Sequence, residues 1–282
     1  MSFTFHRPRS VDAAIALARE QGETARFLGG GTDLIIQINR RQAAPRHLIS
    51  LDGLGLDAIT ETPAEFVIGG MVTHDAVVRH PGFQRQLIAL TEASAVIGGR
   101  QVRNIATVGG NIVNASPAAD LVPVLLSLDA TVELRGSAGA RSMPLDRFLV
   151  ERGRTRRRPD EILTSVRFDR PPAASATAFL KAGRRKAMEI SVVCVAAHLV
   201  RNGKARIAIG AAASRTMRVP EAEELVERQG ASAFGEAARV AAAGMSPIDD
   251  VRSSARYRRL LVAALVERAL LSCVDRIEAA AR

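Results

Sequence analysis

Apolar residues recur at helical spacing in several segments of the first half of the chain. Ser10 is followed by VDAAIALARE, in which a capping residue precedes a helical apolar pattern. A similar pattern begins at Thr32, and others cover Gln84 to Ile97 and residues 121–128. Each of these segments is predicted to form a helix.

Shorter apolar runs between these segments predict strands. They cover residues 26–28, 47–51, 66–69, 130–134 and 162–168. The stretch RNIATVGGNIVNASPAAD, about residues 103–120, is rich in Gly, Asn, Ser and Pro and predicts loops and turns. Alternating strands and helices predict a mixed α/β domain over residues 1–170.

The pattern changes after the Pro171–Pro172 pair. Two long strand-like runs follow, ISVVCVAAHLV and KARIAIGAAA, joined by Asn202–Gly203. An Asn-Gly pair between apolar strands is a strong hairpin signal. The last sixty or so residues are rich in Ala, Glu and Arg and predict helices packed on that sheet. We therefore expect a smaller α+β domain over residues 173–282.

Composition favours a soluble, cytoplasmic protein. In 282 residues, of which 47% are hydrophobic, no apolar run is long enough for a membrane-spanning helix, so no membrane span is expected. The N-terminus places polar residues where a signal peptide needs apolar ones. Cys194 and Cys273 are far apart without a Cys-x-x-Cys motif, so we expect buried thiols and no metal or iron–sulfur site in this chain.

A net charge of +10 suggests an anionic partner of some kind. The densest basic run is RGRTRRR, Arg152 to Arg158. Proteins that bind single-stranded nucleic acid pair such charge with stacking aromatics, whereas this chain has one Tyr and no Trp. We expect no nucleic acid and interpret the basic run as a solvated loop. An anionic cofactor and an acidic protein partner remain open.

The first chemical signal is FLGGGTDLI, Phe27 to Ile35, which combines a strand end, a glycine turn and a helix start. Consecutive glycines expose backbone N–H groups with no Cβ in the way, and the helix start adds partial positive charge. A P-loop would need Lys-Ser/Thr after the last glycine, and the Rossmann pattern would need a glycine three residues beyond Gly31. Both are absent, so the segment predicts an anion cradle of another kind, or an ordinary tight turn.

The second signal is TVGGN, Thr107 to Asn111, which is followed by Asn114 and Asp120. Its glycines permit close backbone approach, and Thr107 and Asn111 offer side-chain hydrogen bonds. Asp120 can cap the next helix or accept from a ligand hydroxyl. Two such segments in one domain predict an extended anionic ligand with two ends, such as a dinucleotide.

At these residues the chain resembles the FAD-binding, or medium, subunit of the xanthine dehydrogenase and carbon monoxide dehydrogenase family of molybdenum hydroxylases. GGGTDL at 29–34 is similar to the family's first FAD diphosphate loop. IATVGGNIVNASPAADLVPVLLSLDA, at 105–130, resembles the second loop almost throughout. DEILTSVRF at 160–168 and FLKAGRRKAMEISVV at 179–193 extend the similarity into both predicted domains.

The resemblance implies an α+β fold: a PCMH-type FAD-binding domain of two α/β subdomains, then a C-terminal α+β domain with an antiparallel sheet and helices. Asp120 would hydrogen-bond the cofactor FAD, Leu163 would touch it, and Lys181 would lie near the flavin, unless Lys181 is a solvated lysine. Carried over by position, the cofactor-binding residues are Phe27, Leu28, Gly29, Gly30, Gly31, Thr32, Asp33, Leu34, Ile35, Thr107, Val108, Gly109, Gly110, Asn111, Asp120, Leu163 and Lys181.

The resemblance also implies an electron-relay role, as an oxidoreductase subunit. A molybdopterin large subunit would hydroxylate the substrate, and a [2Fe–2S] small subunit would pass electrons to FAD in this chain. The acceptor would be NAD⁺, oxygen or another molecule, and the complex a dimer of heterotrimers. Because flavin chemistry belongs to the cofactor, no catalytic acid, base or nucleophile is expected, and the histidines show no pairing pattern.

Two features depart from relatives. In the xanthine dehydrogenase branch an aromatic ring lies against the flavin ten residues before the second glycine motif, where this chain has Ile97. The cysteines of the inserted cluster loop of 4-hydroxybenzoyl-CoA reductase are also absent, which disfavours that subgroup.

Two other functions are weighed against this one. A self-contained flavoenzyme of the UDP-N-acetylenolpyruvoylglucosamine reductase type has a triple-glycine loop and a comparable length. It would need its own proton donor, and the tail NASPAAD is not its pattern. The other alternative is a non-enzymatic binding module that uses the basic face of this fold for a partner.

Overall fold

The N-terminal part of the chain forms a small parallel sheet covered by one helix. A computed structural model describes residues 3–185 and 187–281. Its strands are β1 (Thr4–His6), β2 (Ala25–Leu28) and β3 (His47–Ser50), with β3 in the centre and parallel to both neighbours. Helix α1 (Val11–Gln21) begins as predicted at Ser10, whose hydroxyl accepts from the Ala13 N–H. The short helix α2 (Leu34–Asn39) follows β2.

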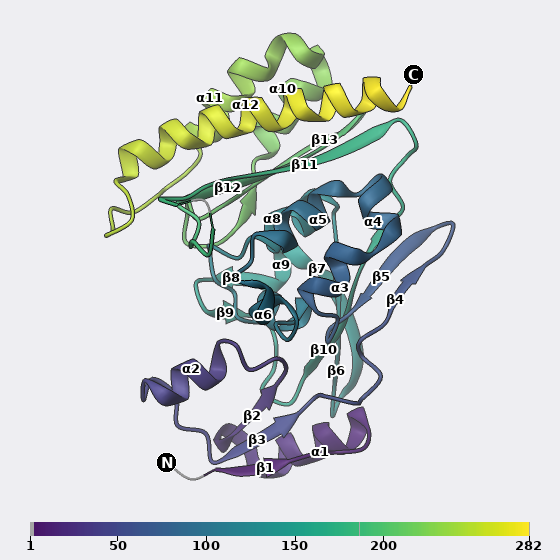
Figure 1. The fold of residues 1–282 in the computed structure, drawn as a ribbon, viewed down its shortest axis with the longest axis vertical. Helices are drawn as coiled ribbons and strands as arrows, with labels where there is room; N and C mark the ends of the chain where they lie inside the picture. The colour runs from purple at the N-terminus through teal and green to yellow at the C-terminus, as the bar shows by residue number, and fades with distance from the viewer. Residues whose placement is uncertain (1–2, 186, 282) are drawn as a thin grey trace.

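The second subdomain is built on an antiparallel sheet of five strands. Their order is β4 (Ile59–Glu61), β5 (Glu65–Gly69), β10 (Ile162–Asp169), β6 (Thr131–Gly136) and β7 (Gly139–Pro144). Seven helices and a small hairpin complete it: α3 (His74–Arg79), α4 (Pro81–Gln86), α5 (Ile88–Ala95), α6 (Arg100–Arg103), α7 (Val108–Val113), α8 (Leu121–Ser127), α9 (Leu145–Phe148), β8 (Leu149–Glu151) and β9 (Arg154–Thr155). In Figure 1 this subdomain lies between the N-terminal sheet and the C-terminal sheet.

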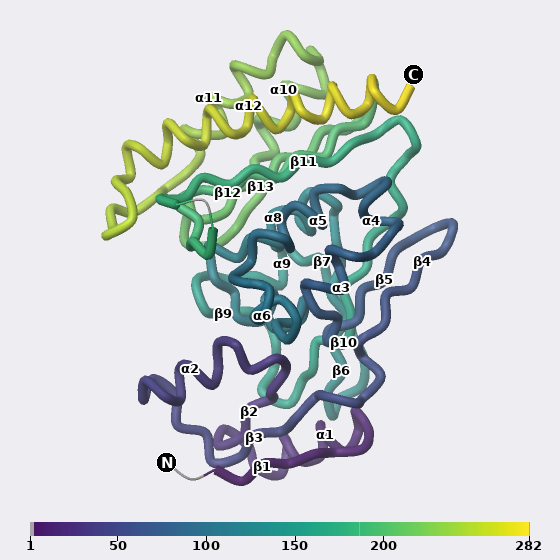
Figure 2. The backbone as a smooth tube through the Cα atoms, in the orientation of Figure 1, coloured from purple at the N-terminus to yellow at the C-terminus, as the bar shows by residue number. Residues whose placement is uncertain are grey.

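The C-terminal part is a four-stranded antiparallel sheet backed by helices. Its elements are β11 (Ser175–Ala182), β12 (Val193–Val200), β13 (Ala205–Gly210), β14 (Met217–Arg218), α10 (Pro220–Gln229), α11 (Phe234–Ala243) and α12 (Ala255–Ala280). The β12–β13 pairing confirms the hairpin predicted at Asn202–Gly203. The tube in Figure 2 shows α12 running along the outer side of this sheet, with the C-terminus far from the N-terminus. No helix within the described residues is both long and apolar enough to cross a membrane.

The C-terminal sheet contributes to two hydrophobic cores, because alternate residues of a strand face opposite sides. Phe179, Cys194 and Ala208 belong to the core of the second subdomain, which includes α5 and α8. Val195 and Ile207 belong to the core under α10, α11 and α12. The sheet is therefore sandwiched between two helical layers, and both its faces are buried.

Three sequence predictions differ from the structure. The helix expected from Gln84 to Ile97 is two helices, α4 and α5, separated by Leu87, whose backbone is non-helical and whose side chain is fully buried. The helix expected from Thr32 begins at Leu34. The glycine-rich stretch 103–120, expected as loops, contains helix α7, because capping by Thr107 stabilises its start in spite of two glycines.

Candidate functional site

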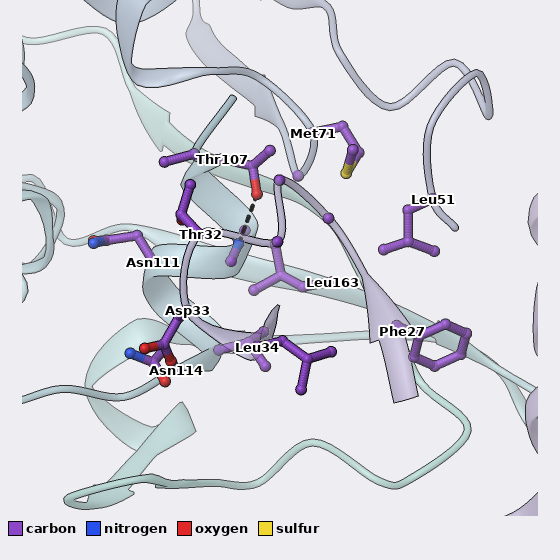
Figure 3. A pocket seen from close by; sticks show the side chains of 18 of the residues that line it. Phe27, Thr32, Asp33, Leu34, Leu51, Met71, Thr107, Asn111, Asn114 and Leu163 are labelled. Carbon is purple, nitrogen blue, oxygen red and sulfur yellow. Dashed lines mark hydrogen bonds between the residues drawn. The ribbon is translucent and has the colours of Figure 1, made fainter. Parts of the chain in front are cut away.

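A cavity of about 610 Å³ lies between the N-terminal sheet and the second subdomain, within the size range of cofactor sites. Both glycine segments line it, together with residues from β2, α2, α7 and β10. Figure 3 shows Phe27 and Leu51 on one side of this cavity and Asn111 and Asn114 on the other. The two glycine segments therefore line one cavity, and their binding of a single ligand stays a prediction.

The first glycine segment, Gly29–Gly31, presents an unused row of backbone donors. Among the described residues, none of the N–H groups from Gly29 to Leu34 has a hydrogen-bond acceptor, and α2 has no side-chain cap. Gly31 has a backbone φ of 72°, a conformation that residues with a side chain rarely adopt. Several free amides in consecutive positions can bind an anion, and each hydrogen bond to a charged oxygen contributes roughly 1.5–3 kcal/mol.

Gly30 has a different role, since it lets the two segments touch. A Cβ on Gly30 would lie 1.7 Å from the carbonyl oxygen of Ile105, just before the second segment. A Cβ on Gly29 would lie 3.1 Å from the Thr107 hydroxyl. The two walls of the cavity are thus in direct backbone contact at this point.

In the second segment the amides from Val108 to Asn111 all have acceptors inside the protein. The Val108 and Gly109 N–H groups donate to the carbonyls of Val72 and Gly70, at 2.9 and 2.8 Å. The Gly110 N–H donates to the Thr107 hydroxyl at 3.1 Å, and the Asn111 N–H donates to the Thr107 carbonyl at 2.9 Å. Within the described residues only the Thr107 amide of this segment lacks an acceptor, so most of the free donors come from the first segment.

Two buried polar atoms of the cavity lining lack partners. Asn111 Oδ1 and His74 Nδ1 are buried without a hydrogen bond from any residue that the structure describes. Burial, together with the charge of Arg103, lowers the pKa of His74 to about 4, so its imidazole is neutral at pH 7. Because buried polar groups are nearly always hydrogen-bonded, these atoms fit a site that receives a polar ligand.

Apolar side chains form another part of the lining. Phe27, Leu51 and Leu163 belong to the N-terminal sheet, the segment after it and β10. Ile97 and Val102 lie before and within α6. Ile97 therefore lines the cavity. This agrees with the expectation that it occupies the position where some relatives have an aromatic ring.

The structure brings most of the predicted cofactor residues to this cavity. Those that line it are Phe27, Gly29, Gly30, Gly31, Thr32, Asp33, Leu34, Thr107, Gly109, Gly110, Asn111 and Leu163. Leu28, Ile35 and Val108 belong to the same segments but are not part of the lining. Val108 is fully buried in the core, while Leu28 and Ile35 are partly buried.

Asp120 and Lys181 are also outside the lining, and they bind one another. Lys181 Nζ donates to Asp120 Oδ2 at 2.6 Å and to the Glu189 carbonyl at 2.7 Å. The Ser191 hydroxyl donates to the other oxygen of the Asp120 carboxylate. Burial raises the pKa of Asp120, and the charge of Lys181 opposes that effect. Asp120 does not cap α8, so this alternative for its role is wrong.

Sequence reasoning missed several residues of the lining. They are Arg26, Gln37, Leu51, Gly70, Met71, His74, Val102, Ala106, Val113, Gly153, Arg157, Glu161 and Ile162. Gly70 had a detectable sequence signal, since it belongs to a Gly69–Gly70 pair at the end of β5. In the structure, a Cβ on Gly70 would lie 2.2 Å from the Leu163 carbonyl oxygen. The histidines were expected to be unpaired, yet His6 and His47 hydrogen-bond at 2.9 Å across β1 and β3.

Comparison with known proteins identifies the family. Residues 1–171 match the family described as FAD binding domain in molybdopterin dehydrogenase, and residues 178–273 match the CO dehydrogenase flavoprotein C-terminal domain. The chain belongs to this family of FAD-binding subunits. It is 32% identical to the carbon monoxide dehydrogenase medium chain of Afipia carboxidovorans, with 100% of this chain and 98% of the relative covered. It is 34% identical to a putative xanthine dehydrogenase FAD-binding subunit of Escherichia coli over 79% of each.

The fold comparison agrees with the sequence comparison. A carbon monoxide dehydrogenase structure from Hydrogenophaga pseudoflava superposes with a TM-score of 0.94 at 29% identity, covering 98% of both chains. The α+β fold is therefore confirmed, and the chain is a flavoprotein subunit of the molybdenum hydroxylase family, with FAD as its cofactor. The free amides, the glycine-lined walls and the unpartnered Asn111 and His74 atoms fit FAD in this cavity.

Proposed function

We propose that this chain carries electrons from [2Fe–2S] clusters of a small subunit to an acceptor, in a complex whose molybdopterin large subunit oxidises the substrate. The observation that carries the proposal is the row of free amides from Gly29 to Leu34 inside a cavity of cofactor size. FAD supplies the redox chemistry when bound, since a flavin exchanges one or two electrons. The acceptor is NAD⁺, oxygen or another small molecule.

In this proposal the amides of the first segment hold the diphosphate of FAD. The second segment, Thr107 to Asn111, forms the opposite wall, and Asn111 Oδ1 accepts a hydrogen bond from the cofactor. Leu163 packs against it from β10. The protein thus binds and orients the cofactor and excludes water from it, and no side chain needs to transfer a proton.

The Asp120–Lys181 pair has a proposed positioning role near the flavin. Asp120 belongs to the FAD-binding part, at the start of α8, whereas Lys181 is on β11. Their ion pair, with Ser191, holds the segment 189–191 of the C-terminal part against the end of the glycine-rich stretch. We keep the domain division as a proposal, with residues 1–170 forming the FAD-binding domain and 173–282 the C-terminal domain.

An exposed apolar patch next to the cavity wall favours a protein partner there. Met188, Ile190 and Val251 are 62%, 60% and 92% exposed. The loops that carry them are bonded together, because Arg184 Nη1 donates to the Val251 carbonyl at 3.2 Å. A Cβ on Gly99, close to Ile97 of the lining, would lie 3.7 Å from the Met188 sulfur. Grouped apolar exposure of this kind marks interaction surfaces.

We assign this patch, Met188, Ile190 and Val251, to the small subunit, since clusters docked there approach the cofactor cavity. The relatives are medium chains by name, which supports a complex of several subunits. We propose that the complex is a dimer of heterotrimers. We also propose that it is cytoplasmic, in keeping with two buried free thiols and no disulfide among the described residues.

The test of electron transfer uses the FAD-loaded chain and its small subunit, produced from the neighbouring open reading frame. Reduced small subunit should bleach the flavin absorbance of the wild-type chain when the two are mixed without oxygen. Met188→Asp with Val251→Asp should slow the bleaching at least tenfold, because charges disrupt an apolar interface. A control variant, Leu271→Asp, alters an apolar residue of α12 that is 49% exposed and should have no effect. No bleaching with wild type would refute the proposed function.

A further inference from the structure

The Phe27 side of the cavity carries two arginines that no feature of the proposed electron transfer requires. Arg26 precedes Phe27 on β2, and Arg157 follows β9; both line the cavity. Arg157 belongs to the basic run 152–158, which the sequence predicts as a solvated loop. The prediction is wrong for this residue, because Arg157 is half-buried whereas Arg156 and Arg158 are exposed.

Arg157 is held in place by three carbonyl oxygens. Its Nη1 donates to the carbonyls of Arg158, Pro159 and Glu161, at 2.9, 3.1 and 2.8 Å. Its guanidinium carbon lies 6.0 Å from the centre of the Phe27 ring. A planar group fixed along one edge is preorganised for a ligand on its other edge, where Nε and Nη2 have no partner among the described residues.

No carboxylate bonds to either arginine within the described residues. Glu161 is the nearest candidate for Arg157, but its carboxylate accepts two bonds from Arg141, at 2.6 and 2.8 Å, and one from the Arg158 N–H at 2.6 Å. Arg26 donates only to the carbonyls of Glu23 and Ala25 in that part of the chain. Burial and the charge of Arg26 lower the pKa of Arg157, while the charges of Glu161 and Asp160 oppose that effect.

Glu161 and Asp160 are the acidic residues that act on Arg157, but within the described residues neither carboxylate bonds to it, so the free edge of its guanidinium can bind a ligand that supplies acceptors. The free amides begin at Gly29, directly after Phe27 and Leu28, so a diphosphate held there has one half of FAD beside Phe27. The other side of the cavity approaches α6, Ile97 and the patch proposed to receive the small subunit. The redox-active ring belongs on that side, where electrons arrive, and the adenosine half therefore belongs beside Phe27, Leu51 and Arg157.

We propose that Arg157, assisted by Arg26, is the specificity-determining residue for the adenosine monophosphate half of FAD. The free edge of Arg157 donates to acceptor atoms of adenosine and its phosphate, while Phe27 and Leu51 contact the base. The site consequently selects FAD over FMN, which lacks this half. This inference rests on the proposed placement of the diphosphate at Gly29–Leu34.

The experiment compares ligands on the full-length chain after FAD is removed. Arg157→Gln should weaken FAD binding at least tenfold and should weaken ADP binding by a similar factor, since charge-assisted hydrogen bonds are lost. FMN and riboflavin binding should stay within about twofold of wild type, as the interactions lost lie outside both molecules. Flavin fluorescence measures the flavins, and calorimetry measures ADP.

The matched control is Arg158→Gln, one residue away, whose side chain is 57% exposed. It removes the same charge from the same run and should change no affinity by more than about twofold, because exposed charges contribute little. An equal loss of FAD and FMN affinity in Arg157→Gln would place Arg157 on the flavin side and overturn the inference. Unchanged FAD affinity would overturn it as well.

A second variant separates binding from folding. If Arg157→Gln lowers the melting temperature of the apoprotein, Arg26→Gln should show a smaller loss with the same selectivity for FAD and ADP, since Arg26 lines the cavity but is exposed and does not tie the loop 158–161. A wild-type chain that binds FMN but not ADP would contradict the inference on its own. If no flavin binds at all, the proposed function fails first, so the two failures are distinguishable.

Discussion

The two glycine segments look alike in sequence but serve different physical purposes. Gly29–Gly31 follows a strand, and the amides from Gly29 to Leu34 have no acceptor within the described residues. Thr107–Asn111 starts helix α7, and the amides from Val108 to Asn111 are all bonded inside the protein. Glycine therefore exposes donors in the first segment, while in the second it removes bulk.

Within each segment, one glycine is required for close backbone approach. A Cβ on Gly30 would lie 1.7 Å from the Ile105 oxygen, and one on Gly109 would lie 2.5 Å from the Gly70 oxygen. Gly110 differs, because its Cβ would meet only the Thr107 hydroxyl, at 2.9 Å. Substitution can therefore separate packing from cofactor binding, residue by residue.

The largest effect is expected from Gly30→Ala. The methyl group would overlap a backbone oxygen that cannot move alone, so the two walls of the cavity must separate. We expect a loss of at least about 3 kcal/mol in the free energy of unfolding, and loss of FAD. Urea unfolding measures the free energy of unfolding, and flavin absorbance measures the bound FAD. Gly235→Ala, where the nearest atom would be a flexible Glu267 oxygen at 3.7 Å, should cost nothing. Equal stability of the two variants would show that Gly30 is not a packing glycine.

Gly110→Val and Gly109→Val distinguish cofactor binding from packing in the second segment. Gly110→Val should fold and melt near the wild-type temperature but lose most of its FAD, because the side chain enters the cavity without meeting backbone. Gly109→Val should also be unstable, because it displaces the end of β5 at Gly70. Flavin content per chain and melting temperature give the comparison. Normal flavin content in Gly110→Val would remove this segment from the site.

His74, which bonds to the chain just before the second segment, makes the stability of the protein depend on pH. Its backbone N–H donates to the Ala106 carbonyl at 3.1 Å, and its folded-state pKa of about 4 lies below the unfolded value of 6.5. The unfolded chain thus takes up a proton first, so stability is complete above pH 6.5 and falls as the pH drops towards 4. The loss amounts to about 3 kcal/mol. His74→Asn should lose correspondingly less stability between pH 7 and pH 4 in urea unfolding. Parallel curves for both proteins would contradict a buried neutral histidine.

The smallest effect is expected from Thr107→Val. The substitution keeps the shape but removes the hydroxyl that accepts from the Gly110 N–H, which should cost about 1 kcal/mol in unfolding free energy. FAD affinity should change little, since the diphosphate is assigned to the first segment. Thr107→Ser should restore stability. A tenfold loss of FAD affinity at unchanged stability would transfer the diphosphate to the second segment.

The sequence predicted much of this fold because the spacing of apolar residues indicates which side of a helix or strand is buried. Ser10, Asn202–Gly203 and the strand runs were placed correctly by local chemistry. The split at Leu87 was missed because a buried leucine fits an uninterrupted helix equally well. Helix α7 was missed because its glycines serve long-range contacts, which no local propensity contains.

The site was predictable where backbone chemistry decides it and not where the tertiary fold does. The glycine segments are recognisable because consecutive residues lack side chains. Arg157 has the same sequence context as Arg156 and Arg158, and only the path of β9 and the loop 158–161 turns it inward. His74 and Leu51 likewise reach the cavity through folding of distant elements.

The shared faces of the C-terminal sheet bear on how this chain can be cut and recombined. A truncated chain ending near residue 171 would uncover the helix faces that pack against Phe179 and Ala208, and it would leave the Asp120 carboxylate without its ammonium partner. Isolating the flavin-binding half should therefore yield aggregates, although it matches a family of its own. Recombination between relatives has to exchange both halves together, or else redesign the surface where they meet.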